Sequence, residues 1–264
     1  MYDFTYHKPK SVSDALDTLS GADDGQFIAG GQTIIPVMKQ RLAMPSDVID
    51  LGGIADLQGI SVSGGIVSIK AMTPHAHVAA SADVKSAIPA LAELASLIGD
   101  PHVRNRGTIG GSIANNDPAA DYPAAVLGLG ATVKTDKREI AGDDFFLDIF
   151  ETALDDGEMI TAVDFPVPDG AAYIKFPNPA SRFALVGVMV SRTGGNVRVA
   201  VTGAGPCVFR VAEMEQALAA NFVADSVAGV SVPADGLNTD IHASAEYRAH
   251  LIKVLTGRAV AKIA

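Results

Sequence analysis

The spacing of apolar and polar residues predicts that helices and strands alternate along the first part of the chain. From Ser11 to Leu19 apolar residues recur at helical spacing, and Asp14 follows Ser11 at the distance of a capping box. The elements predicted next are the strand Gln26–Ile28, the glycine loop Ala29–Thr33, a helix through Val37, Met38 and Leu42, the strand Asp47–Leu51, a hairpin over Ile60–Ile69 that turns at Gly64-Gly65, and a helix opened by Thr73-Pro74.

A longer helix is predicted from Val84 to Ile98, because apolar residues keep the helical period up to a stop at Gly99. The segment that follows, His102–Pro123, is rich in Gly, Asn and Asp and poor in large apolar residues. Loops of that length inside a compact domain are usually functional or disordered. We therefore predict a functional loop, anchored in a core by its Ile109 and Ile113.

The rest of the chain continues as a mixture of helices and strands, and Pro166, Pro168 and Gly170 mark a boundary within it. Before the boundary we predict a helix from Tyr122 to Leu129 and strands over Ala131–Thr135 and Met159–Phe165. After it we predict a strand at Tyr173–Phe176, a buried strand at Phe183–Val190, a hairpin at Gly194-Gly195-Asn196, and helices at Val211–Leu218 and Ser244–Leu255. The pattern predicts an α+β chain with a larger first part and a smaller second part.

Composition and charge exclude several classes of protein. The apolar stretch Phe183–Val190 covers eight residues, far below the roughly 20 that a transmembrane helix needs. A formal net charge of −10, with one local basic cluster at His102, Arg104 and Arg106, argues against a nucleic-acid partner. The single cysteine, Cys207, excludes a disulfide framework, a multi-cysteine zinc site and an iron–sulfur cluster ligated within the chain. The first ten residues resemble no secretory signal, so we expect a cytoplasmic protein.

Two distant glycine pairs, Gly30-Gly31 and Gly110-Gly111, are the main candidates for chemistry. Glycine lets successive backbone N–H groups converge on an anion, and two such loops could share one diphosphate. Either pair alone is more simply a tight turn. The polar run Asn115–Asp117 and Asp121 follow the second pair closely, which indicates hydrogen bonding to a large cofactor with polar and flat apolar parts. Neither loop has the G-x-G-x-x-G pattern of a Rossmann dinucleotide site.

These segments carry a resemblance to a known family. AGGQTI at Ala29–Ile34 and RNRGTIGGSIANNDPAADYP at Arg104–Pro123 resemble the paired flavin motifs of the xanthine dehydrogenase and carbon monoxide dehydrogenase family. Further matches extend along essentially the whole chain. The resemblance implies a two-part N-terminal FAD-binding domain of the PCMH or vanillyl-alcohol-oxidase type over residues 1–168, with subdomains at about 1–55 and 56–168, and a smaller α+β C-terminal domain over 169–264.

The resemblance also implies which residues bind FAD. These are Phe27, Ile28, Ala29, Gly30, Gly31, Gln32, Thr33, Ile34, Thr108, Gly110, Gly111, Ser112, Ile113, Asn115, Asp117, Asp121, Ile160 and Lys175. By the resemblance, Lys175 lies close to the flavin, where its charge would stabilise the reduced ring and raise its potential. His75 matches a cofactor-side turn, although by the residues alone His75 and His77 are cap and surface residues. The stretch Ser181-Arg182-Phe183-Ala184-Leu185 departs from the family, because many relatives have an arginine and then an acidic residue with an aromatic neighbour after the lysine, and this stretch has no acid.

The implied function is electron transfer without substrate chemistry on this chain, so no catalytic or metal-ligating residue is assigned. The resemblance implies a medium subunit that takes electrons from iron–sulfur clusters on a small [2Fe-2S] subunit and passes them through FAD to NAD, a quinone, oxygen or another acceptor. A large molybdenum-cofactor subunit would oxidise the substrate, in a heterotrimer or a dimer of heterotrimers. Two alternatives are a stand-alone flavin oxidoreductase of related fold and a non-catalytic assembly subunit that has lost FAD.

Overall fold

The N-terminal part folds into a small parallel sheet with two helices. The computed structural model describes residues 1–264. The elements of this part are β1 (Thr5–His7), α1 (Val12–Ser20), β2 (Gly25–Ile28), α2 (Ile34–Lys39) and β3 (Asp47–Asp50), followed by 3-10 turns at Leu51–Gly53 and Ala55–Leu57. Strand β3 lies between β1 and β2 and runs parallel to both. Ser11 caps α1 by accepting a hydrogen bond from Asp14 N–H, as predicted.

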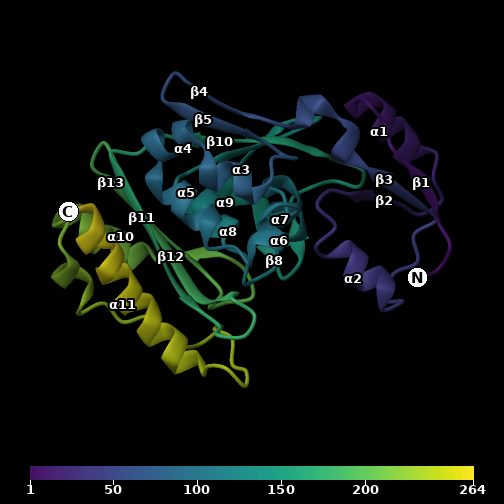
Figure 1. Cartoon of the computed structure of the whole chain (residues 1–264). Helices are drawn as coiled ribbons and strands as arrows, with labels where there is room; N and C mark the ends of the chain where they lie inside the picture. The colour runs from purple at the N-terminus through teal and green to yellow at the C-terminus, as the bar shows by residue number, and fades with distance from the viewer.

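A five-stranded antiparallel sheet and a layer of short helices form the centre of the molecule (Figure 1). The sheet has the order β4-β5-β10-β6-β7. Its elements and their neighbours are β4 (Ile60–Ser63), β5 (Ile66–Lys70), α3 (His75–Ala80), α4 (Ala82–Ala87), α5 (Pro89–Ser96), α6 (Pro101–Arg104), α7 (Ile109–Asn115), α8 (Tyr122–Gly128), β6 (Thr132–Thr135), β7 (Glu139–Ala141), α9 (Gly142–Phe145), the small hairpin β8 (Phe146–Asp148) and β9 (Glu151–Thr152), and β10 (Ile160–Pro166).

The C-terminal part is an antiparallel meander, β11-β12-β13-β14, against which two helices pack. Its elements are β11 (Gly170–Pro177), β12 (Ala184–Thr193), β13 (Asn196–Thr202), β14 (Phe209–Arg210), α10 (Ala212–Ala220), a 3-10 turn at Ala224–Val227 and α11 (Ala245–Ile263). The two termini lie at opposite ends of the molecule (Figure 1). None of the helices combines the length and the apolar character needed to span a membrane.

Three apolar cores hold these parts together. The smallest packs Ile49 and Ile54 of the N-terminal part against Met159 beside the central sheet. The C-terminal core lies between the meander and its two helices. The largest core fills the centre and extends into the C-terminal sheet through residues such as Tyr173 and Met189. Burying one such large apolar side chain stabilises the fold by roughly 1.5–3 kcal/mol. The division into domains at residues 168 and 169 stays a prediction.

Four predicted elements differ from the structure. The helix predicted through Val37, Met38 and Leu42 ends at Lys39, so Leu42 lies beyond it. The helix predicted from Val84 to Ile98 is two helices, because Pro89 has no N–H group and keeps Ile88 out of the helical conformation (φ −139°, ψ 76°). The long loop predicted over 102–123 contains the whole of α7, and α8 begins within it. The last helix runs eight residues beyond the predicted end at Leu255, to Ile263. The predicted mixture of α and β elements is confirmed.

Candidate functional site

A cleft of about 570 Å³ lies between the N-terminal part, the central helices and the turn that precedes β12. That volume falls in the range of roughly 300–1,000 Å³ typical of small-molecule and cofactor sites. The β2–α2 loop, the first turns of α7, the start of β10 and residues 181–183 all contribute to its lining. The cleft therefore brings together the two glycine pairs that are 80 residues apart in the sequence.

The two glycine segments are in direct contact. A Cβ atom added at Gly30 would lie 2.7 Å from Gly107 Cα and would overlap the carbonyl oxygen of Arg106. Gly31 has a positive φ of 74°, which L side chains rarely adopt, and a Cβ there would lie 2.6 Å from Ile35 Cδ1. Gly30 is therefore needed for the close approach of the β2–α2 loop to the chain just before α7, and Gly31 for the conformation of the loop itself.

The β2–α2 loop presents a run of free backbone donors. The N–H groups of the six successive residues from Ala29 to Ile34 donate no hydrogen bond to the rest of the chain. All six residues line the cleft. Gln32 and Thr33 are exposed, whereas the other four residues are buried or half-buried. Most buried or half-buried N–H groups in folded proteins have a partner, so these four without one indicate that a ligand supplies the acceptor. The donors suit the oxygens of a diphosphate.

The second glycine pair differs from the prediction. Gly110 and Gly111 lie in the first turn of α7, where Thr108 is the N-cap. Gly110 N–H donates to Ala71 O at 2.8 Å, and Gly111 N–H donates to Thr108 Oγ1 at 3.2 Å. Their amides are therefore already used within the chain. The absence of a side chain is what matters at Gly110, because a Cβ there would lie 2.6 Å from Ala71 Cβ.

His75 contributes a polar atom that lacks a partner in the chain. The ring is buried, lines the cleft, and has its Nδ1 without a hydrogen bond. Burial, and secondarily the charge of Arg104, lowers the pKa of His75 to about 4, so the ring is neutral at pH 7. The expectation that His75 is a surface residue is wrong, whereas His77 is exposed. A buried, unsatisfied ring nitrogen in the cleft fits a ligand that hydrogen-bonds to it.

Comparison with known families identifies the kind of ligand. Residues 2–168 match the family described as the FAD binding domain in molybdopterin dehydrogenase. The chain belongs to this family. Its cofactor is FAD. The free amides of the β2–α2 loop, the glycine contact and the unsatisfied His75 nitrogen all fit an elongated dinucleotide in the cleft.

Similar proteins are medium subunits of multi-subunit dehydrogenases. The chain is 36% identical to the nicotine 6-hydroxylase medium subunit of Paenarthrobacter nicotinovorans, over 97% of this chain and 95% of that protein. It is 34% identical to the carbon monoxide dehydrogenase medium chain of Hydrogenophaga pseudoflava, over 97% and 96%. The structure of quinoline 2-oxidoreductase from Pseudomonas putida 86 contains a chain with a TM-score of 0.89 and 28% identity, covering 99% of this chain and 96% of that chain.

Most of the predicted cofactor residues line the cleft of this FAD-binding subunit. They are Phe27, Ala29, Gly30, Gly31, Gln32, Thr33, Ile34, Thr108, Gly110, Gly111, Ser112, Asn115, Asp117, Asp121 and Ile160. Three others are not among the lining residues: Ile28 ends β2, Ile113 is fully buried in the central core, and Lys175 lies on β11. The contacts of each residue with FAD stay a prediction.

Lys175 and Asp121 form a buried ion pair. Lys175 Nζ lies 2.9 Å from Asp121 Oδ2 and donates a second bond to Leu97 O at 3.0 Å, while Tyr173 Oη donates to Asp121 Oδ1 at 2.6 Å. The two charged side chains are only 4% and 3% exposed. Burial raises the pKa of the Asp121 carboxyl, and the neighbouring Lys175 charge acts to lower it. This FAD-binding subunit therefore uses both residues to join its C-terminal sheet to the cleft wall.

The polar run after α7 is also largely satisfied within the chain. Asn116, in a left-handed conformation, donates from Nδ2 to Asp148 O and Glu151 O at 2.8 Å each and so fixes the β8–β9 hairpin. Asp117 Oδ1 accepts a hydrogen bond from Ala119 N–H at 2.9 Å. Only part of the polar character read from the sequence is therefore available to a cofactor.

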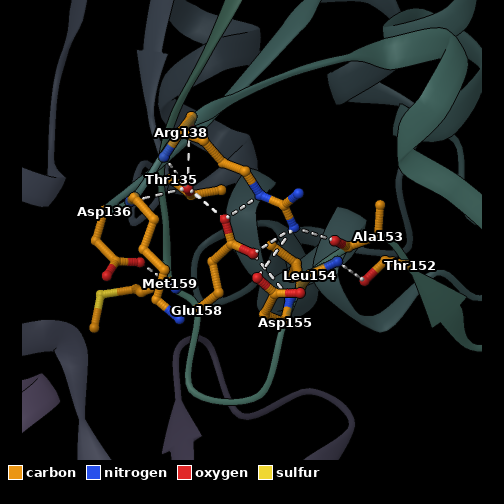
Figure 2. A network of polar contacts seen from close by, with 10 residues as sticks. Thr135, Asp136, Arg138, Thr152, Ala153, Leu154, Asp155, Glu158 and Met159 are labelled. Carbon is orange, nitrogen blue, oxygen red and sulfur yellow. Dashed lines mark hydrogen bonds and ion pairs between the residues drawn. The ribbon is translucent and has the colours of Figure 1, made fainter.

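Glu158 anchors the wall of the cleft next to Met159 and Ile160 (Figure 2). Its fully buried carboxylate accepts from Arg138 Nε at 3.0 Å and Arg138 Nη2 at 2.9 Å, and from the Thr135 hydroxyl at 2.7 Å. A bidentate arginine pair of this kind fixes geometry as well as charge. The network attaches the turn between β6 and β7 to the segment that enters β10.

The same turn is tied to the cleft wall at a second point (Figure 2). Asp136 Oδ1 accepts from Met159 N–H at 2.7 Å, and Asp136 N–H donates to Met159 O at 2.9 Å. Arg138 lowers the pKa of Glu158 to about 2, helped by the N–H of Asp155. The carboxylate is therefore ionised in the folded protein over almost the whole pH range.

We expect Glu158 to make stability depend on pH in a defined window. Its pKa is lower in the folded chain (about 2) than the ordinary 4.5. Its contribution is therefore fully present above about pH 4.5 and is lost as the pH falls toward 2. Urea unfolding at several pH values should show E158Q less stable than the unaltered chain by about 1.5–3 kcal/mol at pH 7, with the difference shrinking below pH 4.5.

The control for this experiment is E151Q, because Glu151 is exposed and forms no ion pair. E151Q should follow the unaltered chain at every pH. A gap between E158Q and the unaltered chain that stays constant down to pH 2.5 would contradict the proposed titration of Glu158.

Two features of the site were not assigned from the sequence. Glu158 has no role predicted from the sequence, because its partner Arg138 is 20 residues away and a lone glutamate carries no signal. Arg182 lines the cleft, although it was noted only as a departure from the family pattern. In both cases the sequence shows only a charged residue next to a predicted strand. Such residues are too common to identify a functional site.

Proposed function

We propose that this chain holds FAD in the cleft and passes electrons from iron–sulfur clusters on a partner subunit to an external acceptor. The observation that carries the proposal is the run of six unpartnered N–H groups from Ala29 to Ile34 along the cleft wall. When bound, FAD supplies the ability to exchange electrons singly or in pairs. The chain itself supplies binding, orientation and electrostatics.

The backbone of the β2–α2 loop would bind the diphosphate. Hydrogen bonds to a charged group contribute roughly 1.5–3 kcal/mol each, so a few of these donors are enough to hold a dinucleotide. No lysine lines the cleft, which fits recognition through main-chain amides. His75 is neutral at pH 7 and would use Nδ1 to hydrogen-bond the cofactor without adding charge.

The buried and the exposed parts of the cleft lining suit different parts of FAD. Leu51, Met72 and Met159 are buried, apolar and part of the smallest core, which suits the adenine. Arg182 and Phe183 also line the cleft but are exposed. The ring that exchanges electrons must be reachable from outside, so we assign it to this exposed part, the open end of the cleft.

The proposed assembly contains a large molybdenum-cofactor subunit and a small [2Fe-2S] subunit, in a heterotrimer or a dimer of heterotrimers. The names of the relatives, which are medium subunits or medium chains, support this arrangement. The proposed location is the cytoplasm, in keeping with a single free cysteine. A stand-alone oxidoreductase is less well supported, because two of the three carboxylates that line the cleft, Asp121 and Glu158, are held in ion pairs, and the third, Asp117, accepts a hydrogen bond from Ala119 N–H.

Purification of the full chain with FAD tests the proposal. We expect a yellow protein with about one FAD per chain, released on denaturation, and co-purification of iron and molybdenum when neighbouring subunits are co-expressed. A chain that stays colourless after reconstitution but still binds its partners would instead be an assembly subunit. Oxidation of an organic substrate by the isolated flavoprotein would favour the stand-alone oxidoreductase.

A further inference from the structure

The cleft is lined by one positively charged side chain that is not held in an ion pair. Among the lining residues Arg182 is the sole arginine or lysine. The carboxylates of Asp121 and Glu158 are neutralised by Lys175 and Arg138, which do not line the cleft. Arg182 forms no ion pair within 4.0 Å, although its charge is one of the causes that lower the pKa of Asp100. Its charge is therefore available to whatever occupies the open end of the cleft.

Arg182 is held by a rigid turn between β11 and β12. Asn178 is buried, and its Oδ1 accepts from the N–H groups of Ala180 and Ser181 at 2.9 and 3.1 Å. Arg182 N–H donates to Asn178 O at 2.9 Å, and Asn178 N–H donates to Phe183 O at 2.7 Å. These bonds fix the backbone from which the guanidinium extends.

The conformation of Arg182 is costly. Its φ is 64°, in the left-handed region that non-glycine residues occupy at a cost of roughly 1–2 kcal/mol. Such strain is found at sites where the surrounding structure imposes it. The turn thus keeps a non-glycine residue in a position that glycine would occupy at lower cost.

Reduction of flavin changes the charge of the ring. A ring that takes up two electrons from the iron–sulfur partner and one proton carries one negative charge. A nearby cation stabilises that product more than the neutral oxidised ring, and so raises the reduction potential. The family resemblance implies that Lys175 is the cation that stabilises the reduced ring. However, Lys175 lies outside the cleft lining and is paired with Asp121.

We propose that Arg182, and not Lys175, is the cation that stabilises the reduced flavin ring in this chain. The inference rests on the proposed function, since it assumes that FAD lies in the cleft with its ring at the open end.

Spectroelectrochemical titration of the FAD-loaded full chain tests the proposal. In R182Q the equilibrium between oxidised and reduced flavin should shift about tenfold toward the oxidised form, relative to the unaltered chain. This shift corresponds to a midpoint potential lower by about 30 mV for a two-electron couple. R182K should keep most of the potential. R258Q is the matched control, because Arg258 is exposed on α11 and forms no ion pair. Since Arg182 is exposed, the shift should shrink as ionic strength rises.

Sulfite binding gives an independent readout. Sulfite adds to the oxidised ring and leaves it negatively charged, which bleaches the visible flavin absorption. R182Q should therefore bind sulfite about tenfold more weakly, whereas R258Q should match the unaltered chain. An R182Q protein that holds FAD with unchanged potential and sulfite affinity overturns the inference but leaves the proposed function intact. Loss of FAD from R182Q also overturns it, because the side chain would then serve binding. An unaltered chain that takes up no FAD would defeat both proposals.

Discussion

G30A should bind FAD about a hundredfold more weakly than the unaltered chain while remaining folded. The added Cβ would overlap the Arg106 carbonyl and lie 2.7 Å from Gly107 Cα. Both contacts are with backbone atoms, which cannot relieve a clash by changing rotamer as a side chain can. The β2–α2 loop must therefore move away. Overpacking of this kind typically costs about 1–3 kcal/mol, and about 2.7 kcal/mol corresponds to a hundredfold change in affinity. Flavin absorption after equilibrium dialysis gives the affinity.

The matched control is G229A, because a Cβ at Gly229 meets nothing within 4 Å. This variant should bind FAD as the unaltered chain does, and both variants should unfold at similar urea concentrations. Normal FAD affinity in G30A would mean that the contact between the two glycine segments is not needed for binding.

K175M should lower the free energy of unfolding by about 3–5 kcal/mol, the usual cost of breaking a buried ion pair by removing one partner. It would leave Asp121, which is only 3% exposed, with Tyr173 as its remaining hydrogen-bond donor. The doubly altered chain D121N/K175M should recover most of the loss, because it leaves no uncompensated charge. Urea unfolding at pH 7 measures both quantities.

K262M is the comparison variant for this experiment. Lys262 also pairs with a carboxylate, Glu93, but both side chains are about half exposed (46% and 42%). Exposed pairs contribute only about 0–1 kcal/mol. If K175M and K262M destabilised the chain equally, Lys175 and Asp121 would not behave as a buried pair.

The regular elements could be predicted well because their signals are local. Glycine pairs marked the hairpin turns, and Gly99 and Pro166 marked ends of elements, because these residues impose backbone conformations independently of tertiary structure. The chain Ala29–Thr33 was predicted as a glycine loop after a strand and before a helix, and the structure confirms that placement. The division at Pro89 was missed, although proline restricts its neighbour locally.

The parts that could not be predicted depend on distant contacts. Helix α7 contains Gly110 and Gly111, which disfavour a helix by about 1 kcal/mol each, and it forms because Gly110 packs on Ala71 and Thr108 caps it. Lys175 was assigned to the flavin by the family resemblance, and its ion pair with Asp121, 54 residues away, could not be predicted from the sequence. The sequence shows which polar groups exist, but only the fold shows which of them are already satisfied by one another.

The free hydrogen-bond donors of the β2–α2 loop are main-chain N–H groups, and this affects which amino-acid substitutions the loop can tolerate. A substitution cannot delete a backbone N–H group unless it introduces proline. The side chains of Gln32, Thr33 and Ile34 can therefore change without removing the proposed hydrogen bonds to phosphate oxygens, as long as the backbone conformation of the loop is kept. Selection at this site should therefore conserve Gly30 and Gly31, which set the backbone conformation. It should tolerate changes in the side chains of their neighbours.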